Sequence, residues 1–598
     1  SEIAKKVEER IKDKWQEIAE KAKELLKEEA KIPVNEKLWN QQISNAIEIV
    51  STWLEFFSFN TFNNVKDELP NDLKKMQEEW LKFVGEAEKR TNYGHFYALT
   101  YELLGIILTQ KSRLWKAWEE KPITDKKCLM CGRRNALIEN SLREGYRYWN
   151  GEKWNKASIS DQLKHTLALK RGERLCAVCL VKRLYRRGIF KKLFSLKDEY
   201  LPKPESTVDI AGRDFINNVK GDEDFHLLKL VDIELIYPHE WESEEKRESS
   251  IKELENLGVK ERIYKKLSEW WNTYKEPNKY YDILMKDGDR IGKWLSGERW
   301  KEDCEEKGLP NFEEFLHPAF REKIKEWREN GKKKGEELIK TKRILTSSHH
   351  IAISRAMKDF SLYKVPEIVE KFDGFLVYAG GDDVLALFPT DKVLDAAYEI
   401  QKYFKKDFYE ANINGKKRRI TGLGNKASMS AGIVFAHYKW PLYDVIEKVR
   451  EAEKEAKNKY RRDAFCITFI KRSGEILTAG GKWEFKERFD EIMRMLSPSD
   501  EKRRKLSHRF VYDLLDVFRV LKREEGWEES YISILKAEVK RLLKKKRYEN
   551  RLTEEDTKKL FEETFSPLID EYMKKKLSLE DMGIMLNILY DAYRGEER

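Results

Sequence analysis

The sequence predicts an α+β protein in which a ferredoxin-like βαββαβ unit lies between two mainly helical regions. Between residues 280 and 470, apolar runs of strand length alternate with stretches of helical periodicity, in the order strand, helix, hairpin, helix, strand, helix and strand. Residues 3–26 and the C-terminal region instead repeat apolar side chains at helical spacing among Lys and Glu. Two Cys-x-x-Cys pairs add a metal-binding module. The expected divisions are 1–275 with the module at about 120–190, 276–480, and 481–598.

The size and charge of the chain limit the kinds of protein to which it can belong. A chain of 598 residues exceeds what one hydrophobic core usually serves, so several domains are expected. Lys plus Arg number 118 against 107 Asp plus Glu, a surplus of 11 that suits contact with nucleic acid through local patches. No apolar run approaches the length of a membrane span and no signal peptide precedes the first helix, so we expect a cytoplasmic protein without a membrane partner.

The N-terminal part of the chain predicts helices that pack through aromatic side chains. Residues 3–26 place apolar side chains on one helical face, and two further helical stretches rich in Trp and Phe cover about 42–59 and 72–118. Such aromatic stripes more often form core than base-stacking platforms. The run from Leu227 to Tyr237 has the composition of a strand.

Four cysteines occur in two closely spaced pairs, Cys128 with Cys131 and Cys176 with Cys179. Paired Cys-x-x-Cys segments can place four thiolates at the corners of a tetrahedron, as a structural Zn²⁺ site requires. Two disulfides are disfavoured in a cytosolic protein, and a redox pair is disfavoured by the presence of two copies. We therefore expect structural zinc that closes a long loop.

The region expected to hold the catalytic residues begins with an apolar run, residues 280–289, that ends in Asp287, Gly288 and Asp289. This is the profile of a buried strand whose end carries carboxylates. A segment of about 295–345, rich in Lys and Glu, predicts a helical insertion. The later elements are expected as helices from Thr346 past Met357, at 391–405 and at 441–459, and strands at 427–436 and 464–470.

A β-hairpin is predicted where two apolar runs, Phe375 to Tyr378 and Val384 to Phe388, flank Gly380-Gly381-Asp382-Asp383. Glycine permits positive φ and close approach of a phosphate to the backbone. Adjacent carboxylates repel each other unless a cation neutralises them, and oxygen ligands suit Mg²⁺, Mn²⁺ or Ca²⁺. An ordinary solvated turn is the alternative, because Gly and Asp are common turn residues.

The expected strand order brings distant acids together. In a βαββαβ sheet the first strand lies between or beside the hairpin strands, so Asp287 is expected to meet Asp382 and Asp383. Three carboxylates can hold two divalent ions, one that lowers the pKa of an attacking hydroxyl and one that stabilises a leaving pyrophosphate. The predicted catalytic and divalent-metal residues are therefore Asp287, Asp382 and Asp383.

The unit resembles the palm of nucleotide cyclases and GGDEF-type domains at four places that occur in the same order. Asp287-Gly288-Asp289 resembles the acidic end of the first strand, and Gly380 to Asp383 resemble the signature hairpin. Ser430-Ala431-Gly432 resembles the Ser-x-Gly of the following strand, and Lys457 with Arg461-Arg462 resembles the late helix whose Lys contacts the triphosphate. The resemblance implies a nucleotide-binding set of Gly288, Gly380, Gly381, Ser430 and Lys457.

Departures from the cyclase pattern indicate a narrower family. Asp383-Val384 stands where a diguanylate cyclase has Glu-Phe, which disfavours that activity, and a long insertion and a zinc module accompany the hairpin. With Lys286 to Gly292 and a basic helical C-terminus, the chain resembles the large palm subunit of type III CRISPR effector complexes, most similar to the Cmr kind. Members of that family carry two palms, so a degenerate first palm within about 32–275 is implied.

That resemblance implies an antiviral, RNA-guided complex in which this subunit binds ATP and divalent metal and polymerises ATP into cyclic oligoadenylates once target RNA is bound. Other subunits, guide RNA and target RNA are the implied partners. A catalytically silent, nucleotide-binding scaffold is the alternative, and product formation distinguishes the two. Full-length members also carry an N-terminal HD nuclease domain. No His-Asp dipeptide occurs here, so DNA cleavage is not expected of this chain.

The C-terminal region predicts a small helical bundle. Phe510, Leu514 and Val517 share one helical face, and the segments that start at Thr553 and Ser578 predict capping boxes. Basic runs at 502–505 and 544–547 are interpreted first as solvated faces. Contact with RNA or a partner is the alternative, which the family resemblance strengthens.

Overall fold

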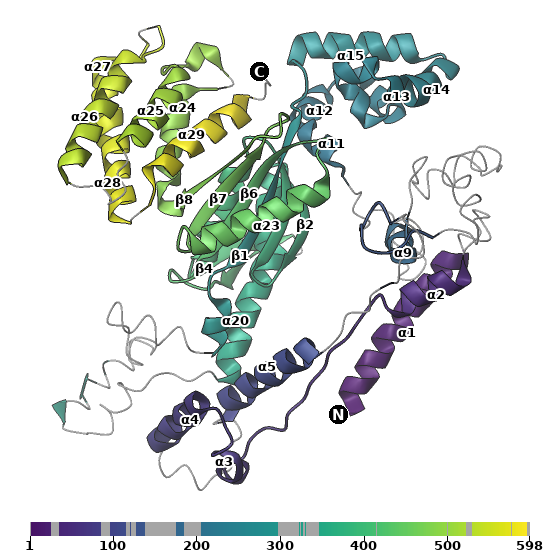
Figure 1. Ribbon diagram of the computed structural model, residues 1–598, viewed down its shortest axis with the longest axis vertical. Coiled ribbons are helices and arrows are strands. Elements are labelled where there is room, and N and C mark those ends of the chain that lie inside the picture. The colour runs from purple at the N-terminus through teal and green to yellow at the C-terminus, as the bar shows by residue number, and fades with distance from the viewer. Residues whose placement is uncertain are drawn as a thin grey trace. The chain divides into compact units, whose positions relative to one another are not determined.

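The computed structural model describes most of the chain, and Figure 1 shows its helices and strands. The described residues are 2–24, 35–84, 96–114, 120, 127–137, 175–184, 205–296, 322, 325–326, 329–330, 346–413, 415–498, 500–521, 529–549, 551–575 and 577–594. They belong to two compact units, residues 1–204 with 303–347 and residues 205–302 with 348–598. The predicted insertion at about 295–345 lies almost wholly outside the described residues.

The first unit is helical in its described parts. Its helices are α1 (Glu2–Glu24), α2 (Glu36–Ser44), α3 (Phe59–Val65), α4 (Asn71–Val84), α5 (Tyr97–Leu114) and α9 (Ala177–Leu184). The predicted first helix is confirmed, but the predicted helix over 42–59 is wrong, because α2 ends at Ser44 and the next helix starts only at Phe59. The β-branched residues Ile47, Ile49 and Val50 disfavour a helix between them.

The segment from 205 to 275 precedes the sheet of the second unit and is also helical. Its elements are α11 (Thr207–Ala211), α12 (Arg213–Val219), η6 (Glu223–Leu230), η7 (Ile233–Ile236), η8 (Pro238–Glu242), α13 (Glu244–Lys246), η9 (Arg247–Ile251), α14 (Lys252–Asn256) and α15 (Lys260–Tyr274). The predicted strand from Leu227 to Tyr237 is therefore wrong. Asp222 and Asp232 accept hydrogen bonds from the amides two residues ahead and start short 3₁₀ turns instead.

Strands are missing from the described parts of residues 1–275, apart from an isolated bridge between Lys127 and Asn135. The sheet of the implied first palm is thus not seen among those residues. The aromatic and β-branched residues that suggested strands here pack as helices and short turns around buried side chains such as Tyr237 and Trp270.

A six-stranded sheet forms the centre of the second unit. Its strands are β1 (Tyr280–Gly288), β2 (Phe375–Gly380), β3 (Asp383–Pro389), β6 (Met429–His437), β7 (Ala464–Ile470) and β8 (Ile476–Lys482), and its helices include α20 (Ser347–Asp359), α21 (Val365–Lys371), α22 (Val393–Phe404) and α23 (Leu442–Asn458). The order is β2-β3-β1-β6-β7-β8, with β6 and β7 parallel and joined through α23. The predicted order of strands and helices is confirmed, and β1 lies beside the hairpin as expected.

Helix α23 packs closely on the sheet, and Figure 1 shows it lying across the strands. A Cβ atom at Gly432 on β6 would lie 2.5 Å from the Glu453 amide nitrogen and would also collide with the Val449 carbonyl oxygen. Only glycine allows this approach. The Ser-x-Gly motif therefore sets the distance between β6 and the helix that carries Lys457.

Three strands were not predicted. β4 (Phe408–Ile413) and β5 (Lys416–Thr421) form a separate two-stranded ribbon, and β8 extends the main sheet beside β7. Lys416 to Arg419 are consecutive charged residues, and β8 contains Gly480 and Gly481, so neither segment has an apolar strand pattern.

The C-terminal helices share one hydrophobic core with the sheet. They are α24 (Lys486–Leu496), α25 (Arg509–Val520), α26 (Glu529–Lys545), α27 (Glu554–Lys559), α28 (Ser566–Lys574) and α29 (Leu579–Arg594). The capping box at Thr553 is confirmed, because its side chain and that of Asp556 exchange hydrogen bonds with each other's amides. Within the described residues, no helix is both long and apolar enough to span a membrane.

Candidate functional site

The end of β1 places its acids beside the hairpin tip. Lys286 is paired with Val384 on β3, and on the other side Asp287 is paired with Ser430 on β6. Residues about a hundred positions apart in sequence are thereby neighbours at one end of the sheet. The predicted juxtaposition of the first strand's acidic end with the hairpin is confirmed.

The tip of the hairpin is a tight turn between β2 and β3, with Gly380 paired to Asp383. Gly381 has a φ of +64°, a conformation that favours glycine, and a Cβ there would meet no atom within 4 Å. Asp382 packs on Gly288, since a Cβ at Gly288 would lie 2.8 Å from both the Cβ and the Oδ2 of Asp382. This glycine lets the two segments approach each other.

The surroundings of the two hairpin carboxylates disfavour their ionised forms. Burial raises the pKa of Asp382, and the charge of Asp383 raises it further, although the amides of Asp382 itself and of Gly288 oppose the shift. Burial also raises the pKa of Asp383. A bound cation would favour the ionised form of both groups.

The Asp287 carboxylate forms an ion pair with Lys457 on α23. The same ammonium lies 2.6 Å from Glu453 Oε1, one helical turn earlier. Burial, aided by the charge of Arg462, lowers the pKa of Lys457 to about 8. Burial together with the charges of Asp289 and Asp383 raises the pKa of Glu453 to about 7.

Sequence reasoning missed Glu453. Its only sequence signal is the Glu-to-Lys spacing of four residues on a helix, which is common on solvated helix surfaces. The structure makes the pair distinctive because both side chains are largely buried and the Lys457 ammonium contacts Asp287 as well as Glu453.

Asp287, Asp382 and Asp383 do not form a closed ligand set in this structure. Within the described residues, the one group of three or more candidate ligand atoms that all lie within 4.8 Å of one another is made of cysteines. Asp287 is neutralised by the Lys457 ammonium instead. The three acids share one end of the sheet, where Lys457 now pairs with Asp287 through Oδ2.

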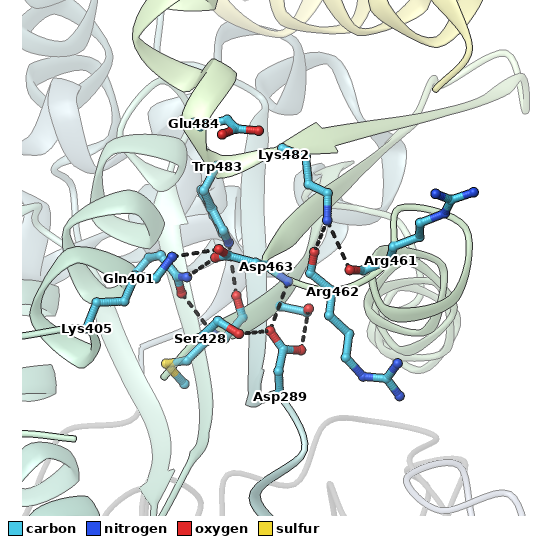
Figure 2. A network of polar contacts seen from close by, with 12 residues as sticks. Asp289, Gln401, Lys405, Ser428, Arg461, Arg462, Asp463, Lys482, Trp483 and Glu484 are labelled. Carbon is cyan, nitrogen blue, oxygen red and sulfur yellow. Dashed lines mark hydrogen bonds and ion pairs between the residues drawn. The ribbon is translucent and has the colours of Figure 1, made fainter. Parts of the chain in front are cut away.

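Asp289 is the centre of a buried hydrogen-bond network, which Figure 2 shows. Its Oδ1 accepts from Ser430 Oγ at 2.6 Å, and its Oδ2 accepts from Ser428 Oγ at 2.7 Å and from the Asp463 amide at 2.9 Å. Ser430, predicted to bind nucleotide, is fully buried and directs its hydroxyl to Asp289. This network ties the end of β1 to the starts of β6 and β7.

Asp463 extends the network to α22. Its carboxylate accepts from Gln401 at 2.5 Å and pairs with Lys405 at 2.6 Å, and the Gln401 oxygen in turn accepts from the Met429 amide. None of these three side chains was singled out in the sequence, because their roles depend on the turn between α23 and β7.

That turn has three consecutive left-handed residues, Arg461 (φ 57°), Arg462 (φ 57°) and Asp463 (φ 44°). Such conformations are unfavourable for residues with side chains and need support from their surroundings. Lys482 donates to the Arg461 and Arg462 carbonyls at 3.0 and 2.5 Å. Figure 2 shows both arginine side chains directed away from Asp463.

Lys286 is a second feature that sequence reasoning did not identify. It is fully buried on β1, donates to the Ala397 carbonyl at 2.7 Å and lies 4.4 Å from the centre of the Trp483 ring. Burial lowers its pKa well below the usual lysine value. Its side chain thus connects β1, the strand that carries Asp287, to α22 and to Trp483.

The four predicted cysteine ligands come together in the first unit. Their sulfur atoms all lie within 4.8 Å of one another, and Cys131 and Cys176 Sγ are 3.9 Å apart. A tetrahedron with Zn–S bonds of about 2.3 Å has edges of about 3.8 Å, so this donor set fits zinc. Hydrogen bonds from the other thiols, that of Cys128 first, lower the pKa of Cys131.

The local fold around the cysteines is held by backbone and amide contacts. The Gly132 amide donates to the Cys128 carbonyl at 2.8 Å with a φ of +63° at the glycine, which closes the first turn. Gln42 on α2 bridges the two cysteine segments, accepting from the Ala177 amide and donating to the Asn135 carbonyl, both at 2.8 Å. The cluster is thus part of a small core rather than a surface loop.

Known proteins resemble this chain in sequence. Residues 280–466 match the family model described as Cas10/Cmr2, second palm domain. The chain is 30% identical over 550 residues to the CRISPR system Cmr subunit Cmr2 of Pyrococcus furiosus, covering 87% of this chain and 54% of that protein. It is 31% identical over 147 residues to Cmr2 of Saccharolobus solfataricus, covering 22% and 14% respectively. The chain thus spans about half of the first relative.

Two solved structures share the fold. A chain of the type III-B Cmr-beta complex in its apo state matches with a TM-score of 0.60 and 17% identity, over 99% of this chain and 68% of that one. The complex bound to cognate target RNA matches with a TM-score of 0.54 and 19% identity, over 85% and 62%. These two structures show a shared fold, and the sequence matches show that residues 280–466 correspond to a Cas10/Cmr2 second palm domain and that the chain is similar to Cmr2 subunits of CRISPR systems over 87% of its length.

Proposed function

We propose that this chain is the large subunit of an RNA-guided type III-B effector complex and that its palm polymerises ATP into cyclic oligoadenylates when target RNA is bound. Guide RNA, target RNA and smaller subunits are the proposed partners. The observation that carries the proposal is the meeting of the β1 acids with the Gly380–Asp383 hairpin at one end of the sheet.

The proposed metal ligands are Asp287, Asp382 and Asp383, and the hard carboxylate oxygens suit Mg²⁺ or Mn²⁺. Two such ions would activate a ribose hydroxyl and stabilise the leaving pyrophosphate. The open turn at Gly381 gives the triphosphate access to the backbone amides of the hairpin. Asp289, through Ser428, Ser430 and the Asp463 amide, holds the end of β1 against the starts of β6 and β7.

Lys457 is proposed to bind the triphosphate. Its ammonium lies between Asp287 and Glu453, so it is already held at the acidic end of the sheet. Asp287 would hold a divalent ion, and Lys457, no longer paired with Asp287, would then bind the phosphate while keeping Glu453 as its partner. Glu453 is then a positioning residue that limits how far the ammonium moves.

A nucleotide-binding scaffold without turnover is the second candidate. Two observations favour it. Lys457 forms an ion pair with Asp287, and the carboxylate oxygens of the three acids do not all lie within 4.8 Å of one another. A resting enzyme would have the same arrangement before metal and nucleotide bind, so product formation is the measurement that separates the two.

The test is synthesis of oligoadenylate from radiolabelled ATP by the assembled complex with target RNA and Mg²⁺ or Mn²⁺. We expect the Asp382→Ala, Asp383→Ala double variant to lose product. Asp516→Ala, at an exposed position on α25, is the control and should keep full activity. Unchanged product from the double variant would refute the assignment, and product from GTP alone would show a different base preference.

We also propose that Cys128, Cys131, Cys176 and Cys179 bind structural zinc. The support is the donor set itself, four sulfurs at distances that fit a tetrahedron. The site would stabilise the first unit and would take no part in nucleotidyl transfer.

A further inference from the structure

The β4–β5 ribbon, residues 408–421, is a feature that the proposed chemistry does not use. Its two strands pair only with each other, and Ile413 is paired with Lys416 beside its turn. Tyr409, Ala411 and Ile420 are buried and fix the ribbon to the palm core. On the other face, Phe408, Glu410 and Asn412 of β4 are exposed and can contact a partner.

Four consecutive cations, Lys416, Lys417, Arg418 and Arg419, cover β5, and all four are exposed. Among the described residues, none of these four side chains forms an ion pair, whereas exposed cations elsewhere, such as Lys371 and Arg450, do. Glu410 is the only acid on the two strands, and it lies across from Arg419. The ribbon therefore carries four exposed positive charges that are not neutralised by ion pairs.

The ribbon also exposes an aromatic ring. Phe408 is 51% exposed, and the Arg419 guanidinium carbon lies 4.2 Å from the centre of its ring. An exposed phenyl ring under a planar guanidinium forms a flat surface on which an unpaired base can stack.

The four cations are divided between the two faces of β5, because successive side chains of a strand point to opposite faces. The register places Lys417 and Arg419 on the face of Phe408, about 6.6 Å apart along the strand, and Lys416 and Arg418 on the face of Ala411. Two cations and one ring therefore lie in a row on the exposed face of the ribbon. A duplex would leave no unpaired base for Phe408.

We propose that the β4–β5 ribbon binds a single strand of nucleic acid, with Lys417 and Arg419 on its phosphates, a base stacked at Phe408, and Lys416 and Arg418 adding to the positive charge at the same end. The ribbon is connected to the site at both ends. Lys405, just before β4, pairs with Asp463, and Ser428, just after β5, donates to Asp289. A nucleic-acid strand bound to the ribbon could therefore influence the hydrogen-bond network around Asp289 through these two contacts. The binding itself does not depend on nucleotidyl transfer.

The test is fluorescence anisotropy of the full chain with a labelled single-stranded RNA, at several salt concentrations. We expect the variant with Lys416, Lys417, Arg418 and Arg419 changed to Gln to bind at least tenfold more weakly. The slope of log affinity against log salt should fall by about 0.7 for each phosphate that the variant no longer neutralises, and so by up to about 3. The control, Lys558→Gln with Lys559→Gln on α27, removes exposed charge elsewhere and should bind as the wild type does.

Phe408→Ala is the second variant, since it leaves every charge in place. We expect it to weaken RNA binding at least fivefold with an unchanged salt slope, because base stacking makes no use of counterion release. Equal binding of duplex RNA, full competition by polyglutamate, or wild-type affinity in both ribbon variants would overturn the proposal.

Discussion

Replacing Gly288 with alanine should misplace the Asp382 carboxylate without unfolding the palm. A Cβ at Gly288 would lie 2.8 Å from Asp382 Cβ and 2.6 Å from Ile291 Cγ1, whereas non-bonded carbon atoms prefer about 3.5–4.0 Å, so both neighbours must give way. The hairpin tip must then move away from β1 by about 0.7–1.2 Å. Gly288 is absent from the positions with positive φ, so the backbone itself tolerates alanine and the collision is the main effect.

A misplacement of about 1 Å can cost about a hundredfold in rate where two groups must share one reacting geometry. We therefore expect Gly288→Ala to reduce oligoadenylate synthesis about a hundredfold in the assembled complex. The decrease in stability should stay within about 1–3 kcal/mol, as for other overpacked positions. The assay is product formation from labelled ATP, with thermal unfolding measured on the same preparations.

Gly292→Ala is the matched control, because a Cβ at Gly292 would meet no atom within 4 Å. It should leave product formation unchanged and, because Gly292 lies in a helix (Ile291–Ser296), should keep or slightly raise the unfolding temperature. Wild-type synthesis by Gly288→Ala would refute the prediction, because the contact between β1 and the hairpin would then not set the geometry of the site.

Three further predictions concern other parts of the chain. Cys176→Ser should lose bound zinc, measured by elemental analysis, whereas Cys466→Ala, a buried cysteine outside the cluster, should retain it. Lys457→Met should tighten Mn²⁺ binding at Asp287, followed by electron paramagnetic resonance, while ATP binding weakens; weaker binding of both would contradict competition between Lys457 and the metal. Burial raises the pKa of the fully buried Asp282 well above 3.8. As pH rises, the unfolded chain loses this proton before the folded chain does. The free energy of unfolding therefore falls by about 1.4 kcal/mol per pH unit between the pKa of Asp282 in the unfolded chain and its pKa in the folded chain. Asp282→Asn should remove that dependence from melting curves at pH 6 and 8, and an unchanged slope would contradict it.

The sequence was sufficient to predict the palm because its signals are local and agree with one another. The hairpin has glycines where its turn needs them, and β1 is apolar up to Asp287. Strand order then follows from the βαββαβ pattern, which places Asp287 beside the hairpin. The cysteine spacing likewise predicted the cluster that the structure contains.

The parts that could not be predicted depend on contacts between distant segments. Glu453 and Lys457 form an ordinary pair along a helix until Gly432 brings α23 against β6, where the pair meets Asp287. Asp463 becomes important only because a left-handed turn directs its amide to Asp289. Neither the packing of α23 onto the sheet nor the turn conformation is visible in residue periodicity.

The missed and wrong elements have a similar cause. The β4–β5 ribbon is polar because one of its faces is exposed, so it lacks the apolar run by which strands were recognised. The residues around Leu227 have strand composition but follow Asp222 and Asp232, whose side chains cap short turns. Local capping outweighed strand propensity there.

The most direct test of the central claim is a structure of the assembled complex with Mn²⁺ and a non-hydrolysable ATP analogue, with the metal located by its anomalous scattering. We predict a metal shared by Asp287 and a hairpin carboxylate, with Lys457 moved from Asp287 to the triphosphate and still in contact with Glu453. A metal bound away from Asp287, with the Lys457–Asp287 ion pair intact and the nucleotide in place, would contradict it.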